Sequence, residues 1–247
     1  MNTLKTIFEE LSRLSRKDYF WYFLFPGVLL VILMIFYFSG NPSLVELVCP
    51  KENPEWGLIE NIQLSFILGI VVVSVYASFK KPFLLPKIGF GLIALFAIFI
   101  FLEEIDYGKH WMQYMYGTKK SLIYDATGVT NFHNQGNNAK LFKRLVYGLM
   151  MIIFFIAPFF KKKIKNEYIS YLIPESKIIS TLILVVFADF VPRFLVHFNI
   201  FEDAGFGNNI GEFSEVIFYY IFLLYVIQLI WEKKWPGGKT QLNETTI

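Results

Sequence analysis

Residues 19–38 form an unbroken run of twenty residues without a charged side chain. An α-helix rises about 1.5 Å per residue, so this run spans roughly 30 Å, the thickness of the hydrocarbon core of a bilayer. The composition agrees, because 55% of the 247 residues are hydrophobic, 19% are aromatic and the mean hydropathy is +0.48. These values lie outside the range of soluble globular domains. The chain is therefore predicted to be an integral membrane protein.

Five further apolar blocks, each bounded by lysines on one side, predict five more crossings. The sequence thus predicts an all-α fold, a polytopic bundle of six transmembrane helices that forms one membrane domain over residues 1–247. A short amphipathic helix over residues 1–17 is expected to lie on the membrane surface, and residues 236–247 are expected to form a flexible tail. The predicted spans are about residues 19–38, 58–79, 88–107, 141–160, 177–198 and 212–231, with a large outer connection over residues 109–140.

The basic residues predict the orientation, because loops on the cytoplasmic side keep an excess of lysine and arginine near the span ends. Arg16 and Lys17 precede the first span, and lysines also fill the second and fourth connections and follow the sixth span. Both termini are therefore expected to be cytoplasmic, in a bacterial inner membrane, although four lysines in the outer connection run against this pattern. The net charge of +3 is attributed to these anchors, so no nucleic-acid partner is expected.

Three of the predicted spans are too short unless they carry acidic or basic residues into the membrane. Only fifteen uncharged residues separate Lys87 from Glu103, and they reach roughly 22 Å as a helix. In the fifth span eleven uncharged residues precede Asp189, so Arg193 must lie within the crossing. The sixth span reaches full length only by including Glu212 and Glu215.

The polar residues in these spans recur at helical spacing, so that each helix offers one polar stripe near its outer end. Asp189, Arg193 and His197 are successive i, i+4 neighbours, and the pairs Glu60 with Gln63, Glu103 with Asp106, and Glu212 with Glu215 are i, i+3 neighbours. Ionisable groups at this depth are costly unless they face each other or a water-filled cavity. The stripes are therefore expected to converge on a polar cavity that faces outward.

All three histidines fall in the outer half of the predicted topology, among several carboxylates. Imidazole and carboxylate groups together are typical ligands of zinc and other divalent ions. The sequence supports the hypothesis of a metal-dependent membrane hydrolase or transferase that acts on a lipid or lipid-linked substrate. The candidate metal ligands are Glu60, His110, His133, Asp189, His197 and Glu212, and the candidate catalytic residues are Glu103, Glu104, Arg193 and Glu215.

Two alternatives use the same residues. In a proton- or ion-coupled carrier of small molecules, the carboxylates and histidines would relay ions. In a protein without enzymatic activity, the polar layer would be a network of ion pairs that fixes the register of the helices. The sequence does not decide among these three interpretations, and it does not predict an oligomeric state.

The segment EEIDYG, followed downstream by NFHN, resembles a pattern of uncharacterised multi-pass bacterial membrane proteins, E-E-x-x-[WY]-G and then N-x-H-N. The chain is also similar in logic to alkaline ceramidase-like membrane hydrolases, which use histidines, an aspartate and zinc, but their closely paired histidines are absent from this sequence. Membrane CAAX-type proteases carry E-E-x-x-x-R, and Gly108 stands here in place of that arginine. The residues that match the first pattern are Glu60, Glu103, Glu104, Tyr107, Gly108, Asn131, His133 and Asn134.

Overall fold

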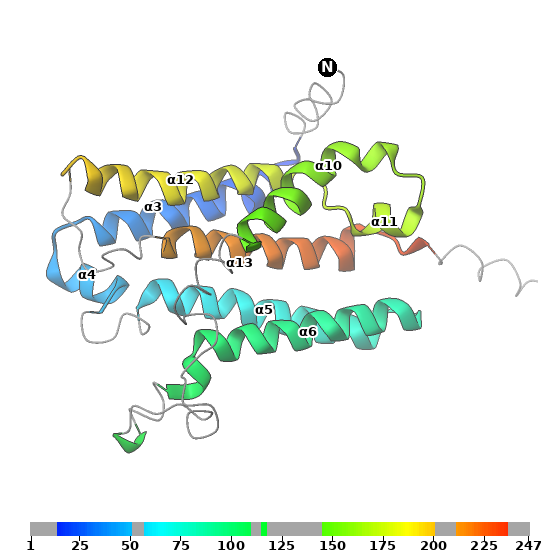
Figure 1. The fold of residues 1–247 in the computed structure, drawn as a ribbon, viewed down its shortest axis with the longest axis horizontal. Coiled ribbons are helices and arrows are strands. Elements are labelled where there is room, and N and C mark those ends of the chain that lie inside the picture. Colours follow the sequence, from blue (N-terminus) through cyan, green and yellow to red (C-terminus); the bar gives the residue numbers. More distant parts are fainter. Residues whose placement is uncertain (1–13, 51–56, 110–114, 118–144, 201–210, 237–247) are drawn as a thin grey trace, which may run out of the picture. The chain divides into compact units, whose positions relative to one another are not determined.

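The computed structural model describes residues 14–50, 57–109, 115–117, 145–200 and 211–236, and Figure 1 shows their arrangement along the chain. These residues form helices and no strand, and six of the helices are long and apolar enough to cross a membrane. The predicted all-α fold with six membrane-spanning helices is therefore confirmed. Residues 1–13 of the predicted surface helix over residues 1–17, most of the outer connection and nearly all of the tail lie outside the described residues.

The six helices agree with the predicted spans to within four residues at every described end. The first, Arg16–Tyr37, is continuous through α2 (Arg16–Tyr19), the π-helical turn η1 (Phe20–Leu24) and α3 (Phe25–Tyr37). The others are α5 (Leu58–Lys80), α6 (Leu84–Glu104), Leu145–Lys163 with η4 (Met151–Ile156), α10 (Ala157–Phe160) and η5 (Lys161–Lys163), α12 (Ile178–His197), and Glu212–Glu232 with α13 (Glu212–Ile227) and η7 (Gln228–Glu232). The short helices α4 (Pro42–Val48), η3 (Asp106–Gly108) and α11 (Glu167–Leu172) lie outside these spans.

The chain divides into two compact units, which we describe one at a time. Unit 1 comprises Met1–Gln63 and Met151–Ile247, and unit 2 comprises Leu64–Met150. The division crosses α5 just after Gln63, so the first six residues of that helix belong to unit 1.

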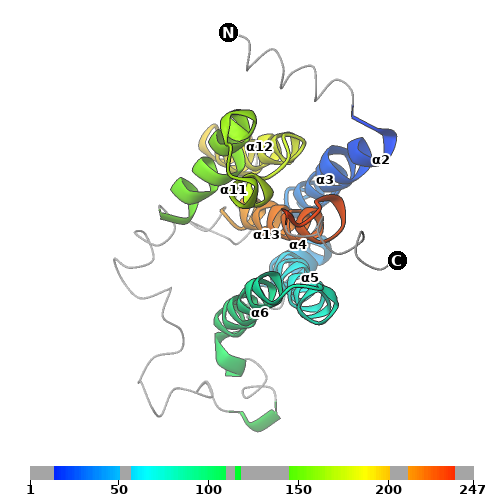
Figure 2. The same ribbon diagram turned by 90° about the vertical axis from the view of Figure 1, so that its right-hand side faces the viewer.

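The centre of unit 1 is formed by α12 and α13, which pack along each other and against α3 (Figures 1 and 2). These two helices are the most deeply buried of the six spans. Aromatic rings join α3 to α13 at two levels. The rings of Phe25 and Tyr220 lie 5.5 Å apart, and those of Tyr37 and Phe213 also lie 5.5 Å apart.

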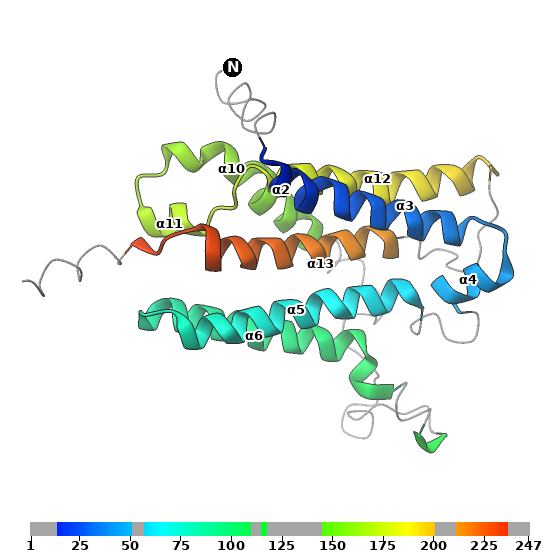
Figure 3. The ribbon, with the colours of Figure 1, turned by 180° about the vertical axis from the view of Figure 1, so that it is seen from behind.

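Two backbone carbonyls in the first helix lose their usual partners, and both gain a side-chain hydroxyl from a neighbouring helix. Pro26 has no N–H group and so cannot donate to the carbonyl of Tyr22, which instead accepts a hydrogen bond from the Thr181 hydroxyl at 2.5 Å. In the π-helical turn just before it, the N–H of Phe25 bonds to Phe20 five residues back, which leaves the carbonyl of Trp21 without its helical donor. That carbonyl accepts from the Tyr220 hydroxyl at 2.7 Å. The first helix, whose path through α2 and α3 is clearest in Figure 3, is thereby bonded to both α12 and α13.

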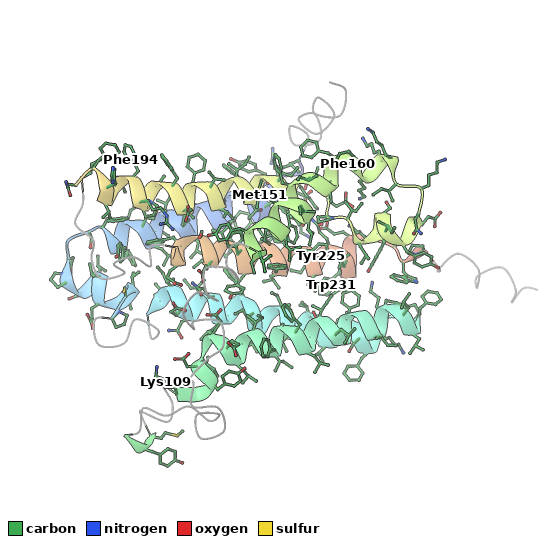
Figure 4. All side chains as sticks on the ribbon, in the orientation of Figure 1. Lys109, Met151, Phe160, Phe194, Tyr225 and Trp231 are labelled. Atoms are coloured by element: carbon green, nitrogen blue, oxygen red, sulfur yellow. The ribbon has the colours of Figure 1, made fainter. Side chains whose placement is uncertain are left out.

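The outer faces of the unit 1 helices carry large apolar side chains. Met151, Phe160, Phe194 and Trp231, all labelled in Figure 4, have between 41% and 57% of their surface exposed. On a membrane-spanning helix such a surface contacts the acyl chains of lipids.

Unit 2 contains α5 from Leu64 onward and the whole of α6. These two helices run antiparallel and are joined by the short connection at residues 81–83 (Figure 1). Along α6 the small residues Ala94 and Ala97 are buried, whereas Leu92, Leu95 and Phe96 are among the most exposed apolar side chains of the chain. The helix therefore presents a broad apolar surface over most of its length. Its acidic residues, Glu103 and Glu104, lie at its C-terminal end.

The hydroxyl groups that satisfy the two freed carbonyls are predicted to stabilise unit 1. Thr181→Val and Tyr220→Phe keep the side-chain shape. Thr181→Val leaves the Tyr22 carbonyl only the longer bond of 3.3 Å from the Ser180 hydroxyl, and Tyr220→Phe leaves the Trp21 carbonyl without its side-chain donor. Each is expected to lower the free energy of unfolding by about 1–3 kcal/mol. The measurement is denaturant unfolding of purified protein in detergent, with Tyr19→Phe as the control because the Tyr19 side chain is exposed. Equal stability of Tyr220→Phe and Tyr19→Phe would contradict the prediction.

Candidate functional site

The ten predicted site residues fall into three groups. Glu103 and Glu104 belong to unit 2, whereas six residues belong to unit 1, and His110 and His133 lie outside the described residues. The convergence of all ten on one cavity stays a prediction. The six residues in unit 1 are Glu60, Asp189, Arg193, His197, Glu212 and Glu215.

The end of α6 differs from the prediction. The third span was expected to continue as helix through residue 107, but α6 ends at Glu104. Asp106 and Tyr107 adopt left-handed backbone angles, with φ values of 47° and 50°, and Gly108 follows at 81°. A right-handed helix cannot pass through such residues, so Glu103 and Asp106 do not share a helical face as i, i+3 neighbours.

This backbone break brings Tyr107 back onto the helix that precedes it. The Tyr107 hydroxyl donates a short hydrogen bond to the carboxylate of Glu103, whose side chain is buried with only 4% exposure. Asp106 is 3% exposed and lies 3.1 Å from the ammonium group of Lys109. Lys109 is labelled in Figure 4. Burial and the hydrogen bond to Glu103 raise the pKa of Tyr107 to about 12, so the phenol keeps its proton at neutral pH.

The break is more elaborate than helix termination requires. A helix commonly ends with one left-handed residue, usually glycine or asparagine, and α12 follows this rule with Asn199 at a φ of 52°. After α6 three consecutive residues are left-handed, and one of them is a tyrosine. The left-handed conformation costs an ordinary residue roughly 1–2 kcal/mol, and such strain concentrates at functional sites.

In unit 1 side-chain hydrogen bonds join the second turn of α5 to the start of α13. The side-chain nitrogen Nε2 of Gln63 donates to the carboxylate of Glu212 at 3.1 Å and to its backbone carbonyl at 3.3 Å. Both side chains are buried, with exposures of 0% for Gln63 and 6% for Glu212. The sequence places Gln63 in the polar layer, but a neutral glutamine carries no charge that would mark it as a site residue. Its spacing of three residues from Glu60 was the signal that could have identified it.

Asp189 and Arg193 form the ion pair that their i, i+4 spacing indicates. The guanidinium nitrogens Nη2 and Nε of Arg193 lie 3.0 and 3.2 Å from the same carboxylate oxygen of Asp189. The Arg193 side chain is 54% exposed, so this pair contributes little to stability. The same nitrogen Nη2 also approaches the start of α13, because a Cβ atom built on Gly211 would lie 3.9 Å from Arg193 Nη2 and 4.0 Å from Glu215 Oε1.

The predicted metal site finds no set of ligands within the part of the chain that the structure describes. There, no three side chains of His, Cys, Asp or Glu lie close enough to hold a metal ion. His197 is exposed, and its ring stands edge-on to the ring of Phe198 at 5.1 Å. A site for zinc or another divalent ion that includes His110 or His133 stays a prediction.

A second charged cluster lies at the opposite ends of the unit 1 helices and has the features of a structural network. The ammonium group of Lys177 pairs with Asp18 at 2.7 Å and with Glu232 at 2.9 Å, and it lies 4.7 Å from the centre of the Tyr22 ring. Burial lowers the pKa of Lys177, but the hydrogen bonds and charges of the two carboxylates outweigh it and hold the pKa above its ordinary value of 10.5. A shallow hollow of about 500 Å³ lies beside this cluster.

Gly108 is predicted to be required for the break after α6. An alanine there would have to adopt a φ of 81°, so Gly108→Ala is expected to lower the free energy of unfolding by about 1–2 kcal/mol. Gly89→Ala, within α6, is the matched control, because its Cβ would meet nothing within 4 Å, and it should be neutral or stabilising. Thermal unfolding of both variants in detergent tests this. A Gly108→Ala variant at least as stable as Gly89→Ala would show that the break is not constrained.

Lys177 is predicted to stabilise the fold in a pH-dependent way. Because its pKa is raised in the folded state, its contribution is complete below the ordinary pKa of 10.5 and is lost as the pH rises through the folded value. Lys177→Met should cost on the order of 2 kcal/mol at pH 8. The difference from wild type should shrink above about pH 10.5. Unfolding measured across this range, with the exposed Lys80→Met as control, checks the expectation, and a constant difference would contradict it.

No protein-family model, no curated protein and no solved structure matches this chain. The function is therefore inferred from the chemistry of the residues described above.

Proposed function

We propose that this chain is a membrane hydrolase or transferase that acts on a lipid or lipid-linked substrate, with Glu103 as its proton-transfer group. The observation that carries the proposal is the buried carboxylate of Glu103, which accepts a hydrogen bond from the Tyr107 hydroxyl. Tyr107 is the second of three consecutive left-handed residues. A strained backbone that positions a buried acid is typical of catalytic sites.

Glu103 would act as a general base and then as a general acid. Its carboxylate takes a proton from the attacking water or substrate hydroxyl as the oxygen of that group bonds to the reacting centre. The proton then passes to the leaving group as the scissile bond breaks. Tyr107 remains protonated at neutral pH and donates to the carboxylate, so that it orients Glu103 without taking part in the proton transfer.

The position of Glu103 favours an amphiphilic substrate. Glu103 stands one residue before the end of a membrane-spanning helix whose exposed side chains are largely apolar. Such a place lies near the boundary between acyl chains and headgroups, where the polar group of a lipid reaches a side chain and its tails stay in the bilayer. The roles predicted for Glu104, Arg193 and Glu215 belong to the same proposal.

The predicted divalent metal stays part of the hypothesis through the histidines. When bound, such an ion would lower the pKa of a coordinated water and so supply the nucleophile. Because the described residues contain no complete ligand set, the chemistry assigned here to Glu103 and Tyr107 includes no step through a metal.

The proposal predicts that lipid turnover depends on Glu103. Purified protein in nanodiscs made from a bacterial total lipid extract should generate new lipid products, detected by mass spectrometry. Glu103→Gln should reduce the rate by at least about 100-fold, the usual contribution of a general base, and Tyr107→Phe should reduce it less. Glu46→Gln, at an exposed carboxylate in α4, is the control and should keep the rate.

Two outcomes would reject the proposal. If the wild-type protein yields no lipid product, or if Glu103→Gln keeps full turnover, Glu103 is not the proton-transfer group of a lipid-modifying enzyme. Ion-coupled uptake into liposomes that Glu103→Gln abolishes, without any lipid product, would instead identify a carrier. Metal analysis of the same samples, with and without chelator, tests the role of the histidines.

A further inference from the structure

We propose that unit 1 holds a binding site for a phosphoethanolamine-type headgroup, with Gln63 and Glu212 for the ammonium group and Arg193 for the phosphate. The inference does not require catalysis at Glu103, and its test measures binding only. It starts from the buried amide of Gln63.

The Gln63 side chain is fully buried, yet its oxygen Oε1 has no hydrogen-bond partner within the described residues. The orientation of the amide is fixed by its neighbours, because the opposite one would place Oε1 against two oxygens of Glu212. A buried acceptor left without a donor destabilises the folded protein. In a membrane-spanning segment, where water is scarce, a donor supplied by a ligand would recover that cost.

The neighbouring groups determine which donor fits. The Glu212 carboxylate accepts a hydrogen bond from the nitrogen of the same amide. The two neighbouring oxygens, Oε1 of Gln63 and the carboxylate oxygen of Glu212, are therefore both acceptors, and the second belongs to an acidic side chain. The two oxygens lie at most roughly 5.4 Å apart, given the planar amide and the hydrogen bond that links them. An ammonium group that donates at about 2.8 Å to each oxygen can bridge that separation. A primary ammonium therefore matches both the hydrogen bonding and the charge of this pair.

The second half of the site is more exposed and combines the Arg193 guanidinium with two carboxylates, since Asp189 pairs with it and Glu215 Oε1 lies near the same point beside Gly211. Gly211, the residue before Glu212, has no side chain, and the guanidinium of Arg193 approaches it. Asp189 engages two nitrogens of that guanidinium through one oxygen, and the Arg193 side chain remains 54% exposed. Arginine is well suited to phosphate because its planar group offers paired donors.

Together these groups run from an exposed cation to two buried acceptors. A zwitterion with a phosphate followed by a primary ammonium has the matching order of charges. A choline headgroup does not fit the buried part, because its quaternary nitrogen has no N–H to donate to Gln63. The site therefore predicts selection by the number of N–H donors on the headgroup.

The test compares lipids that differ only at this nitrogen. Wild-type protein in detergent is titrated with phosphatidylethanolamine, its N-methyl and N,N-dimethyl derivatives, and phosphatidylcholine, and binding is followed by native mass spectrometry and by the shift in unfolding temperature. Phosphatidylethanolamine is expected to bind about tenfold more tightly than phosphatidylcholine, the effect of one charged hydrogen bond. Soluble O-phosphoethanolamine is titrated in parallel, and whichever of it and the lipid binds more tightly identifies the source of the headgroup.

Variants separate the two halves of the site. Gln63→Leu should reduce the preference to less than about twofold, whereas Arg193→Gln should weaken both lipids together. Gln228→Leu makes the same substitution at another fully buried glutamine of unit 1 and should keep the preference, and Arg16→Gln is the control for the arginine. Equal binding of the two lipids to the wild-type protein would overturn the proposal, even if a variant fails to fold. A full preference retained in Gln63→Leu would also overturn it.

Discussion

Unit 1 depends on one constraint, that a backbone carbonyl inside a bilayer must find a donor within the protein. Pro26 and the π-helical turn before it free the carbonyls of Tyr22 and Trp21 on one side of the first helix. Because Thr181 and Tyr220 supply the donors, the defect becomes the point at which three helices are joined. Apolar contacts alone would not fix the register of these helices so firmly, since lipid tails offer each helix a similar environment. The irregular turn therefore helps to specify the fold.

The same helices place two kinds of polar group at their two ends. At one end Lys177 lies between two carboxylates and above an aromatic ring, so its charge is compensated within the protein. At the other end the polar groups are less completely matched. Arg193 is more than half exposed beside its partner Asp189, and the buried amide oxygen of Gln63 has no hydrogen-bond partner within the described part of the chain. From this difference we infer that the charged cluster at Lys177 stabilises the fold, whereas the polar groups at Arg193 and Gln63 bind a ligand.

Much of the fold could be predicted from the sequence, because spans are set by length and hydropathy and the Asp189–Arg193 pair by helical spacing. The end of α6 could not, because helical spacing presumes that the helix continues, and nothing in the letters of EEIDYG indicates two left-handed residues before the glycine. Tyr107 was recognised only as part of a motif, whereas the structure gives it a physical role, to donate to Glu103. The sequence alone does not mark Gln63 as a site residue, because its side chain carries no charge. The metal site depended on histidines, of which only His197 is described.

Two buried glutamines in unit 1 show why the unmatched oxygen of Gln63 carries weight. Gln228 is equally buried, but its amide oxygen accepts from the backbone of Glu175 and its nitrogen donates to the Tyr22 hydroxyl, so both ends are satisfied. The fold thus satisfies a buried amide fully where the amide serves structure. At Gln63 only the nitrogen is engaged, by Glu212, and the residue before Glu212, Gly211, lies beside the Arg193 guanidinium. A leucine of similar size would remove the unmatched oxygen but also the bonds from Nε2 to Glu212, whereas a ligand that donates to Oε1 satisfies that oxygen and keeps those bonds.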